Sequence, residues 1–168
     1  MAEISYRMAT AADAEALAAL RWEMESERHE AHVDQSAFLD ESRATLREGL
    51  TNGTYRAWVA EADGRMISCV VLICWPVMPS MDRLHRSRGM VTNVYTAPEY
   101  RRQGIGRRLM EMLIADAQQR HMQRLILWSS EMGRPLYEQL GFVRSRGYEL
   151  DLPDPSARAP DDADCNLS

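Results

Sequence analysis

Residues 97–110 read APEYRRQGIGRRLM, and they place four arginines around two glycines in a chain whose formal net charge is −5. The stretch follows Met90–Thr96, which is rich in β-branched residues, and precedes the segment 104–121, where apolar residues recur at helical spacing. It therefore joins an expected strand to an expected helix.

This position predicts an anion site. The first turn of a helix leaves backbone N–H groups without partners, and the helix dipole adds partial positive charge there. Gly104 and Gly106 lack a Cβ, so a large anion can approach the backbone. Four side chains add full charges: Arg101, Arg102, Arg107 and Arg108. We predict a site for a phosphorylated ligand; the alternative is a solvated basic helix start, and Arg107 and Arg108 are the arginines most open to that reading.

Two common phosphate motifs do not fit. A P-loop requires Gly-Lys, which the chain lacks, and the dinucleotide fingerprint requires a third glycine where Leu109 stands. What remains is the pattern R-x-x-G-x-G over Arg101–Gly106.

Composition limits the class of protein. The chain has 168 residues, of which 45% are hydrophobic, which suits one domain with a real core. Its pI near 5.4 disfavours nucleic-acid and anionic-lipid partners. The N-terminus does not resemble a signal peptide, and the apolar run Cys69–Trp75 is too short to span a bilayer. The three cysteines lack CxxC spacing, so we expect reduced thiols in a cytoplasmic protein without a metal site.

Local patterns predict a single α/β domain over 1–152 and a disordered acidic, Pro-rich tail over 153–168. A capping box at Thr10 and Asp13 opens the first helix, Ser36 is the expected N-cap of the second, and Asp63-Gly64 marks a hairpin. The segment Pro76–Arg88 reads as an irregular loop. The expected helices are 10–27, 36–50, 104–121 and 134–140, and the expected strands are 3–8, 55–61, 66–75, 90–96, 124–128 and 142–152. The order β-α-α-β-β-β-α-β-α-β predicts a mixed, mostly antiparallel sheet flanked by helices.

Two further segments match a known pattern. The run NVYTAPEYR precedes the glycine motif, and RPLYEQLGF follows at Arg134–Phe142. Together with R-x-x-G-x-G they resemble the GCN5-related N-acetyltransferase (GNAT) family, clearly over Val91–Phe142 and only in architecture before that.

The resemblance implies a site for acetyl-coenzyme A. In that family the glycine motif binds the pyrophosphate through backbone amides, and the strand before it binds the pantetheine arm. The corresponding residues here are Val94, Tyr95, Thr96, Arg101, Arg102, Gln103, Gly104, Ile105, Gly106 and Arg107, with Ser130 where many relatives carry an asparagine. The Val94 amide is the expected donor to the acetyl oxygen.

Acetyl transfer also needs an acid and a neutral amine. Tyr137 aligns with the family's tyrosine near the coenzyme sulfur, and a phenol pKa near ~10 suits proton transfer to a thiolate. The alternative is that Tyr137 only packs its helix against the sheet. Some relatives use a strand glutamate as base, but VTNVYT and LILWSS contain none, so the base is unassigned. Asn93 or Ser129 could orient a relay water.

The acceptor is expected between the segments Trp22–Asp34 and Trp75–Arg88. The candidate contacts are Trp22, Glu25, His29, Trp75 and Met78. Cations near Trp75 would suit an amine that carries a carboxylate or phosphate, whereas the acidic run Glu25–Asp34 would suit a polyamine or aminoglycoside. Core packing explains Trp75 and Met78 equally well.

These observations predict an acetyl-CoA-dependent N-acetyltransferase that acts on a small amine by direct attack in a ternary complex. A protein N-terminus or lysine is the alternative acceptor. A coenzyme A-binding module without turnover is the alternative of another class. Homodimers are common in that family, so the resemblance is compatible with a homodimer, which the residues themselves do not establish.

Overall fold

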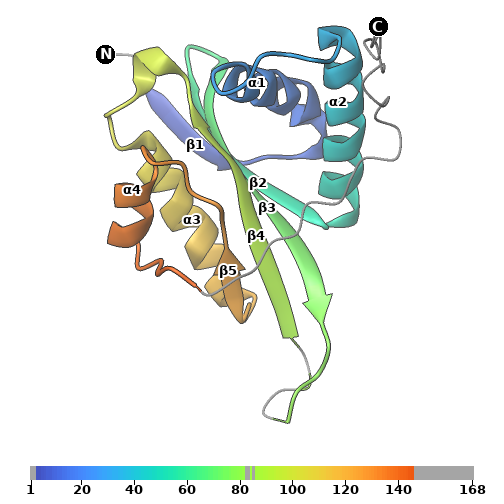
Figure 1. Cartoon of the computed structure of the whole chain (residues 1–168), viewed down its shortest axis with the longest axis vertical. Coiled ribbons are helices and arrows are strands. Elements are labelled where there is room, and N and C mark those ends of the chain that lie inside the picture. The colour runs from blue at the N-terminus through green and yellow to red at the C-terminus, as the bar shows by residue number, and fades with distance from the viewer. Residues whose placement is uncertain (1–2, 82–83, 85, 146–168) are drawn as a thin grey trace, which may run out of the picture.

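A computed structural model describes residues 3–81, 84 and 86–145. The chain forms a five-stranded sheet flanked by helices on both faces (Figure 1). In chain order the elements are β1 (Ile4–Met8), the 3-10 helix η1 (Ala11–Asp13), α1 (Ala14–Ser26), α2 (Gln35–Asn52), β2 (Tyr55–Ala62), β3 (Arg65–Val77), β4 (Arg86–Thr96), the 3-10 helix η2 (Pro98–Tyr100), α3 (Ile105–Gln119), β5 (Arg124–Ile126) and α4 (Arg134–Gln139).

The sheet has the order β1-β2-β3-β4-β5. The first four strands pair antiparallel, and β5 pairs parallel with β4 because α3 carries the chain back over the sheet. This is the mixed, mostly antiparallel α/β arrangement that the sequence predicts.

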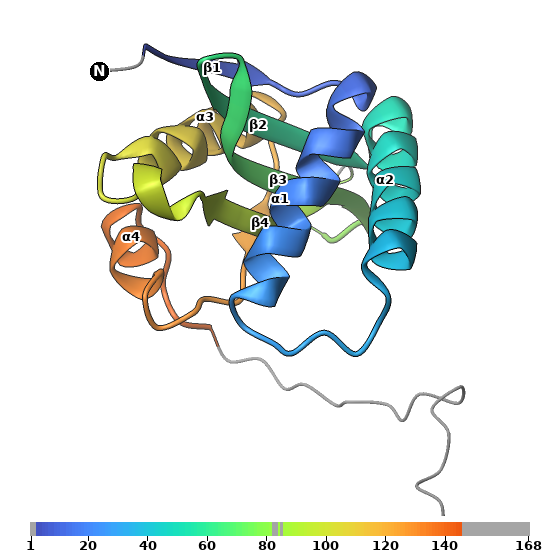
Figure 2. The same ribbon diagram turned by 90° about the horizontal axis from the view of Figure 1, so that it is seen from above.

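Two hydrophobic cores lie on opposite faces of the sheet. One packs α1 and α2 against it around Leu17, Leu46 and Val71, and the other packs α3 against it around Leu72 and Leu113. Figure 2 shows α1 and α2 on one side and α3 on the other. Alternate residues of β3 therefore serve different cores, as the period of a strand requires.

Several local signals act as predicted. Thr10 and Asp13 form the capping box, and the Asp63-Gly64 turn has positive φ at both residues, as a two-residue hairpin needs. The predicted N-cap of α2 is wrong by two residues: Asp34, not Ser36, caps the helix, accepting a hydrogen bond from the Ala37 amide. Ser36 instead donates to the Asp34 carboxylate.

The expectation of an irregular loop over Pro76–Arg88 is also wrong at both ends. β3 continues to Val77 and β4 begins at Arg86, with Trp75 opposite Arg88 and Val77 opposite Arg86. Cross-strand pairing overrides the turn propensity of Pro76 because the two strands extend each other's ladder. The result is a hairpin arm that projects beyond β2 (Figure 1).

The C-terminal expectations are mostly outside the described chain. Residues 142–145 are not in a strand, so the predicted start of the last strand is wrong, and its remainder and the tail 153–168 lie beyond the described residues. Among the described helices, none combines the length and apolar character that a membrane span requires.

Candidate active site

The strand β4 is interrupted by a bulge at Asn93. The register with β3 shifts between Cys69 and Val71, so that one extra β4 residue is accommodated. Asn93 sits at φ 49°, in the left-handed region that asparagine tolerates better than most residues. The bulge shifts the register of the residues that follow, so that Tyr95 and Thr96 pair with Cys69 and Ser68 of β3.

Small polar residues of β3 support this distortion. The buried Ser68 hydroxyl donates to the Tyr95 carbonyl at 2.7 Å and lies 2.8 Å from the Thr96 hydroxyl. The Cys69 thiol donates to the Asn93 carbonyl at 3.3 Å. Burial raises the pKa of that thiol to about 12, so it remains a protonated donor. The sequence predicted only a reduced thiol at Cys69 and carried no signal for this role.

The strands β4 and β5 separate beyond this point. Their ladder covers only Arg88–Met90 and Arg124–Ile126. The edge of β4 from Val91 to Thr96 therefore has no partner strand on that side within the described chain. Val94–Thr96, the main chain expected to bind the pantetheine arm, lies on this edge.

The start of α3 supplies free amide groups. Gly104 is the N-cap at φ 78°, with no side-chain cap, and the first helical bond is donated by the Arg108 amide to the Gly104 carbonyl. Within the described chain, none of the backbone amides from Arg102 to Arg107 donates to another backbone group. A Cβ at Gly106 would meet only Thr96 Oγ1, at 3.6 Å, so the glycine leaves the approach to these amides open. This cradle fits a diphosphate.

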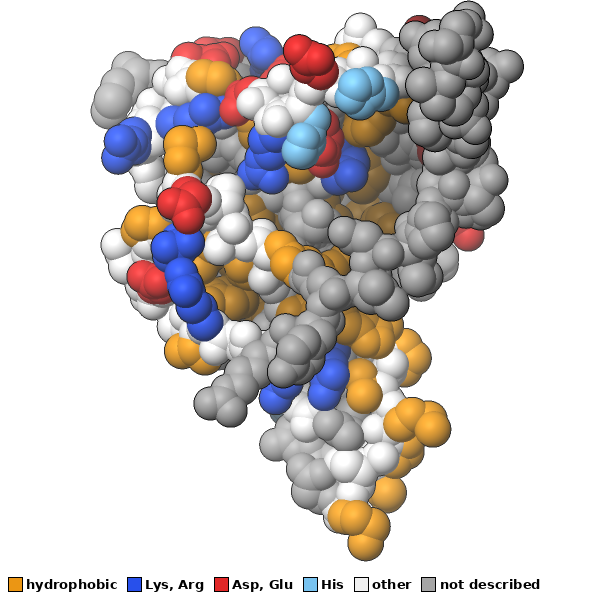
Figure 3. Space-filling view, viewed as in Figure 1, with side chains coloured by type: hydrophobic (Ala, Val, Ile, Leu, Met, Phe, Trp, Pro, Cys, Tyr) orange, Lys and Arg blue, Asp and Glu red, His pale blue; other side chains and the backbone are white. Residues whose placement is uncertain are grey.

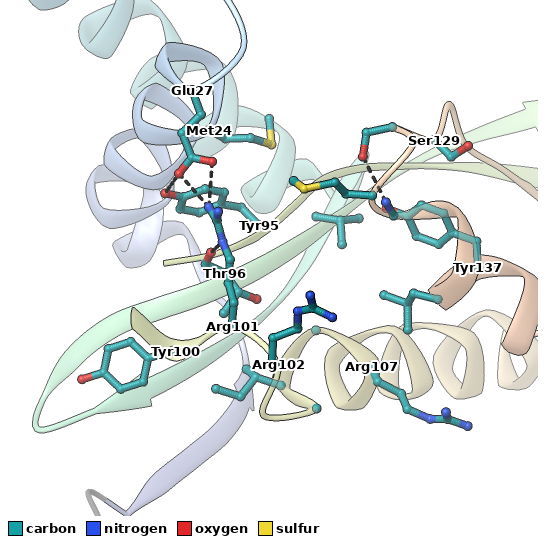
Figure 4. A pocket seen from close by; sticks show the side chains of 18 of the residues that line it. Met24, Glu27, Tyr95, Thr96, Tyr100, Arg101, Arg102, Arg107, Ser129 and Tyr137 are labelled. Carbon is teal, nitrogen blue, oxygen red and sulfur yellow. Dashed lines mark hydrogen bonds and ion pairs between the residues drawn. The ribbon is translucent and has the colours of Figure 1, made fainter. Parts of the chain in front are cut away.

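A cavity of about 900 Å³ joins these parts. Figure 4 shows the bulged strand, the α3 start and Tyr137 around one space. Its lining includes Val94, Tyr95, Thr96, Arg101, Arg102, Gly104, Ile105, Gly106, Arg107, Ser130 and Tyr137 from the predicted set; Gln103 and Asn93 do not line it. A further group was not predicted as cofactor contacts: Met24, Glu27, Arg28, Tyr100, Trp128, Ser129, Met132, Gly133 and Leu136.

Arg101 is committed to a neighbouring carboxylate. Its Nη2 donates to both oxygens of Glu27, at 2.6 and 2.7 Å, and its Nε donates to the Thr96 carbonyl at 2.8 Å. The Tyr95 hydroxyl donates to the same carboxylate at 2.8 Å (Figure 4). We call Glu27, Tyr95 and Arg101 the carboxylate clasp; it joins the end of α1 to the bulged strand and the glycine loop.

Electrostatics within the clasp favour its charged form. Hydrogen bonding from Arg101 lowers the pKa of Glu27, and the same contact raises the pKa of Arg101. Burial and then the Glu27 hydrogen bond raise the pKa of Tyr95. The positive charge of Arg101 is therefore already balanced, which leaves the backbone amides, Arg28 and Arg102 as the main attraction of the cavity for an anion.

Tyr137 is held at the opposite wall by a defined helix end. The Gly141 amide bonds the Glu138 carbonyl, and the Phe142 amide bonds the Tyr137 carbonyl, which is the Schellman pattern. The rings of Phe142 and Tyr137 meet edge to face at 6.1 Å. A Cβ at Gly133 would lie 2.9 Å from the Tyr137 ring, so the absence of a side chain there lets the ring pack against the backbone.

The Tyr137 hydroxyl is suited to give a proton rather than to lose one at rest. Burial raises its pKa above the usual value for a phenol. No hydrogen bond to that hydroxyl is found from the described side chains, so it is available to a ligand in the cavity.

Of the two residues considered for orienting a relay water, only Ser129 lines the cavity. Asn93 is buried and its Oδ1 accepts a 2.5 Å hydrogen bond from Arg21 of α1. The base remains unassigned.

The predicted acceptor contacts lie outside this cavity. Trp22 stacks edge to face on Phe38, and Glu25 pairs with Arg21. His29 is exposed, Trp75 is half-buried on β3, and Met78 is 82% exposed near the hairpin tip. None of these five residues lines the cavity, and their part in acceptor binding stays a prediction.

Comparison with known proteins gives a consistent match. A family model described as an acetyltransferase (GNAT) domain matches residues 53–144. A glucosamine 6-phosphate N-acetyltransferase from Trypanosoma brucei brucei is 33% identical over 90 residues, which are 53% of this chain and 59% of that protein. The chain thus spans less than two thirds of that relative.

Solved structures match over nearly the whole chain. An acetyltransferase from Clostridium acetobutylicum, crystallised with acetyl-CoA, has a TM-score of 0.79 and 25% identity, covering 90% of this chain and 96% of that one. A GCN5-related N-acetyltransferase from Ralstonia eutropha has a TM-score of 0.78 and 27% identity, covering 89% and 99%.

Proposed function

Because the chain belongs to the GNAT family of acetyltransferases, we propose that it transfers the acetyl group of acetyl-coenzyme A to the amino group of a small molecule. One observation carries the proposal: a single cavity connects the unpaired amides at the start of α3 with the hydroxyl of Tyr137. A ligand with a diphosphate at one end and a thioester at the other has the shape that this cavity accepts.

The reaction follows from the positions of these groups. A neutral amine attacks the thioester carbon, so a C–N bond forms while charge develops on the acetyl oxygen. The Val94 amide, on the unpaired edge of β4, is the proposed donor to that oxygen. The C–S bond then breaks, and the Tyr137 hydroxyl gives its proton to the departing thiolate. The positively charged nitrogen of the tetrahedral adduct loses its extra proton to solvent, and solvent later returns a proton to the Tyr137 phenolate.

The acceptor class is proposed as a small amine, in a protein expected to act in the cytoplasm. The name of the trypanosomal relative indicates an amino sugar phosphate as one member of that class. Amino acids, polyamines and aminoglycosides are the other members to be compared. A screen compares these candidates: coenzyme A thiol release is measured with each amine and with peptides that carry a free N-terminus or a lysine.

The screen separates three outcomes. Turnover with small amines but not peptides supports the proposal, and the reverse result supports the protein-acceptor alternative. Tight coenzyme A binding without thiol release from any acceptor would instead indicate a non-catalytic module.

Tyr137→Phe tests the acid. We expect kcat to fall by about 10²-fold, with little change in the KM for acetyl-CoA. Because burial raises the pKa of Tyr137, the wild-type acid should stay protonated at pH values at which an ordinary phenol ionises, and the loss of kcat in the variant should persist at all lower pH values. Tyr100→Phe, at another tyrosine of the same cavity, is the matched control and should leave kcat within about twofold. Full activity of Tyr137→Phe at every pH would remove Tyr137 from the mechanism.

A further inference from the structure

Three residues form a row across the sheet, away from the cavity just described. Trp75 of β3 lies opposite Arg88 of β4, and Arg88 lies opposite Arg124 of β5. Residues directly opposite each other on neighbouring strands project on the same face of a sheet. We call Trp75, Arg88 and Arg124 the arginine row.

The face of this row is the one that carries α1 and α2. A Cβ at the adjacent Gly89 would meet Leu72 and Leu125, which pack in the α3 core. Since side chains alternate along a strand, Arg88 projects on the opposite face. Near Trp75 and Arg88, β3 and β4 form the arm that extends beyond β2 (Figure 1). Basic side chains gather over the β4–β5 region in the space-filling view (Figure 3).

Arg88 and Arg124 have no acidic partner among the described residues. Among the described residues, ion pairs hold Arg7, Arg21, Arg43, Arg56, Arg101, Arg107 and Arg134. Neither Arg88 nor Arg124 has an ion pair in the described chain, and the Arg88 Nε is buried without a hydrogen-bond partner. Like charges directly opposite on adjacent strands are destabilising, and so is an unmatched buried donor. An anion between the two guanidinium groups would relieve both costs.

Apolar residues lie between the arginine row and the cavity. One step along each strand on the same face, Met90 lies opposite Ile126. The chain then continues from β5 to Trp128, which lines the cavity. If the chain stays extended past the end of β5, the Cα atoms of Arg124 and Trp128 are about 13 Å apart. A small amine and two extended arginine side chains can bridge this distance.

We propose that the acceptor amine carries an anionic group, a carboxylate or a phosphate, which Arg88 and Arg124 bind while the amino group reaches the thioester. The inference rests on the proposed acetyl transfer and narrows its acceptor class. Guanidinium groups bind both kinds of anion through paired hydrogen bonds, which lysine cannot reproduce. Polyamines and aminoglycosides are excluded by this charge arrangement.

Matched amine pairs test the inference. Thiol release is measured with glucosamine 6-phosphate against glucosamine, and with alanine against alaninamide. We expect kcat/KM to favour the anionic member of at least one pair by about tenfold or more, and the favoured pair distinguishes phosphate from carboxylate. In Arg88→Gln and Arg124→Gln this preference should fall to about twofold or less, with the KM for acetyl-CoA unchanged. Arg120→Gln, an exposed arginine at the end of α3, is the control and should keep the preference.

A binding readout separates this inference from the proposed function. Arginine Nε–Hε signals are followed by NMR while inorganic phosphate, glucosamine 6-phosphate or alanine is added to the coenzyme A complex. Shifts confined to Arg88 and Arg124 support the row even if no amine is turned over. Thiol release without any anionic preference, unaffected by either substitution, overturns the inference and leaves the acetyl transfer standing. Absence of both thiol release and shifts overturns both. Arg88→Lys, which keeps the charge, should fold and give an intermediate preference.

Discussion

The four arginines of the glycine loop have different environments, although they look equivalent in the sequence. Arg101 is balanced by Glu27, and Arg107 by Glu111. Arg102 lines the cavity without an ion pair among the described residues, whereas Arg108 does not line it. The sequence suggested that all four arginines attract the ligand. In the structure, Arg102 is the one of the four that lines the cavity without an ion pair, and it acts beside the backbone amides.

Arg102→Ala should raise the KM for acetyl-CoA by about tenfold at low salt, with kcat nearly unchanged. The effect should shrink as ionic strength rises, because the side chain is exposed and its charge is screened. Steady-state kinetics at two salt concentrations measure this. Arg108→Ala is the control and should match the wild type; equal effects of the two substitutions would mean that only the general positive field matters.

At the scale of elements, the start of α3 depends on a backbone free of side chains. Gly104 takes the left-handed conformation, whereas a Cβ at Gly106 would make only an ordinary contact with Thr96, so Gly106 serves the approach of a ligand and not the packing of the helix. The same length of helix with a side chain at Gly106 would fold but would cover the amides. The two glycines thus serve the site for different physical reasons.

Gly106→Ala should raise the KM for acetyl-CoA by about 10- to 100-fold, since a methyl group would displace the diphosphate from the amides. The melting temperature should stay the same or rise slightly, because the added Cβ makes only an ordinary contact with Thr96 and alanine favours helix. Calorimetric titration and a thermal melt measure the two effects. Unchanged coenzyme affinity would place the diphosphate elsewhere.

The first strand and the start of the helical layer are joined by another carboxylate. Arg7 of β1 bonds both Asp13, at 2.7 Å, and Glu61 of β2. Hydrogen bonding from Arg7 lowers the pKa of Asp13 from 3.8 to about 2. A carboxyl with a lowered pKa stabilises the fold above its unfolded pKa, and that contribution is lost as the pH falls toward the folded pKa.

Asp13→Asn should therefore lower the free energy of unfolding by about 1–2 kcal/mol at pH 7. The difference from the wild type should stay constant down to about pH 5 and shrink between about pH 4 and pH 2. Urea unfolding at a series of pH values measures it. Asp40→Asn, which removes an exposed partner of Arg43, should change stability by less than about 0.5 kcal/mol. A pH-independent difference for Asp13→Asn would refute the assigned cause.

At the scale of the whole molecule, the sheet separates two cores that must be held in register. Arg56 of β2 and Asp116 of α3 form an ion pair in which each side chain is only 18% exposed. The guanidinium also lies over the Trp58 ring, at 5.9 Å. This pair fixes α3 against the sheet, and with it the loop that begins the helix.

Asp116→Asn should destabilise the protein by about 2–3 kcal/mol, because it leaves a largely buried arginine without its counter-charge. Adding Arg56→Met should recover part of the loss, since the uncompensated charge is then removed. Chemical denaturation of the single and double variants measures both values. A double variant whose loss of unfolding free energy exceeds the sum of the losses in the two single variants would contradict this account.

Much of the fold could be predicted because its signals are local. The capping box, the Asp63-Gly64 turn and the helical period after Gly104 each act over a few residues, and each appears in the structure. The extension of β3 and β4 through Pro76–Arg88 could not be predicted, because it depends on pairing between segments whose own residues favour a turn. The N-cap of α2 was misplaced because Asp34 and Ser36 are both favourable N-cap residues. The backbone conformation that makes Asp34 the cap is visible only in the structure.

The glycine loop, the place of Tyr137 within its short helix and the order of the elements could all be read from the sequence alone. Only the tertiary structure decided which charged side chains are neutralised by ion pairs. Glu27 and Arg101 are 74 positions apart and meet because α1 ends beside the bulged strand. Arg88 and Arg124 face each other because β5 returns parallel to β4. Contacts of this kind depend on distance in space, whereas local sequence signals encode only the conformation of a few neighbouring residues.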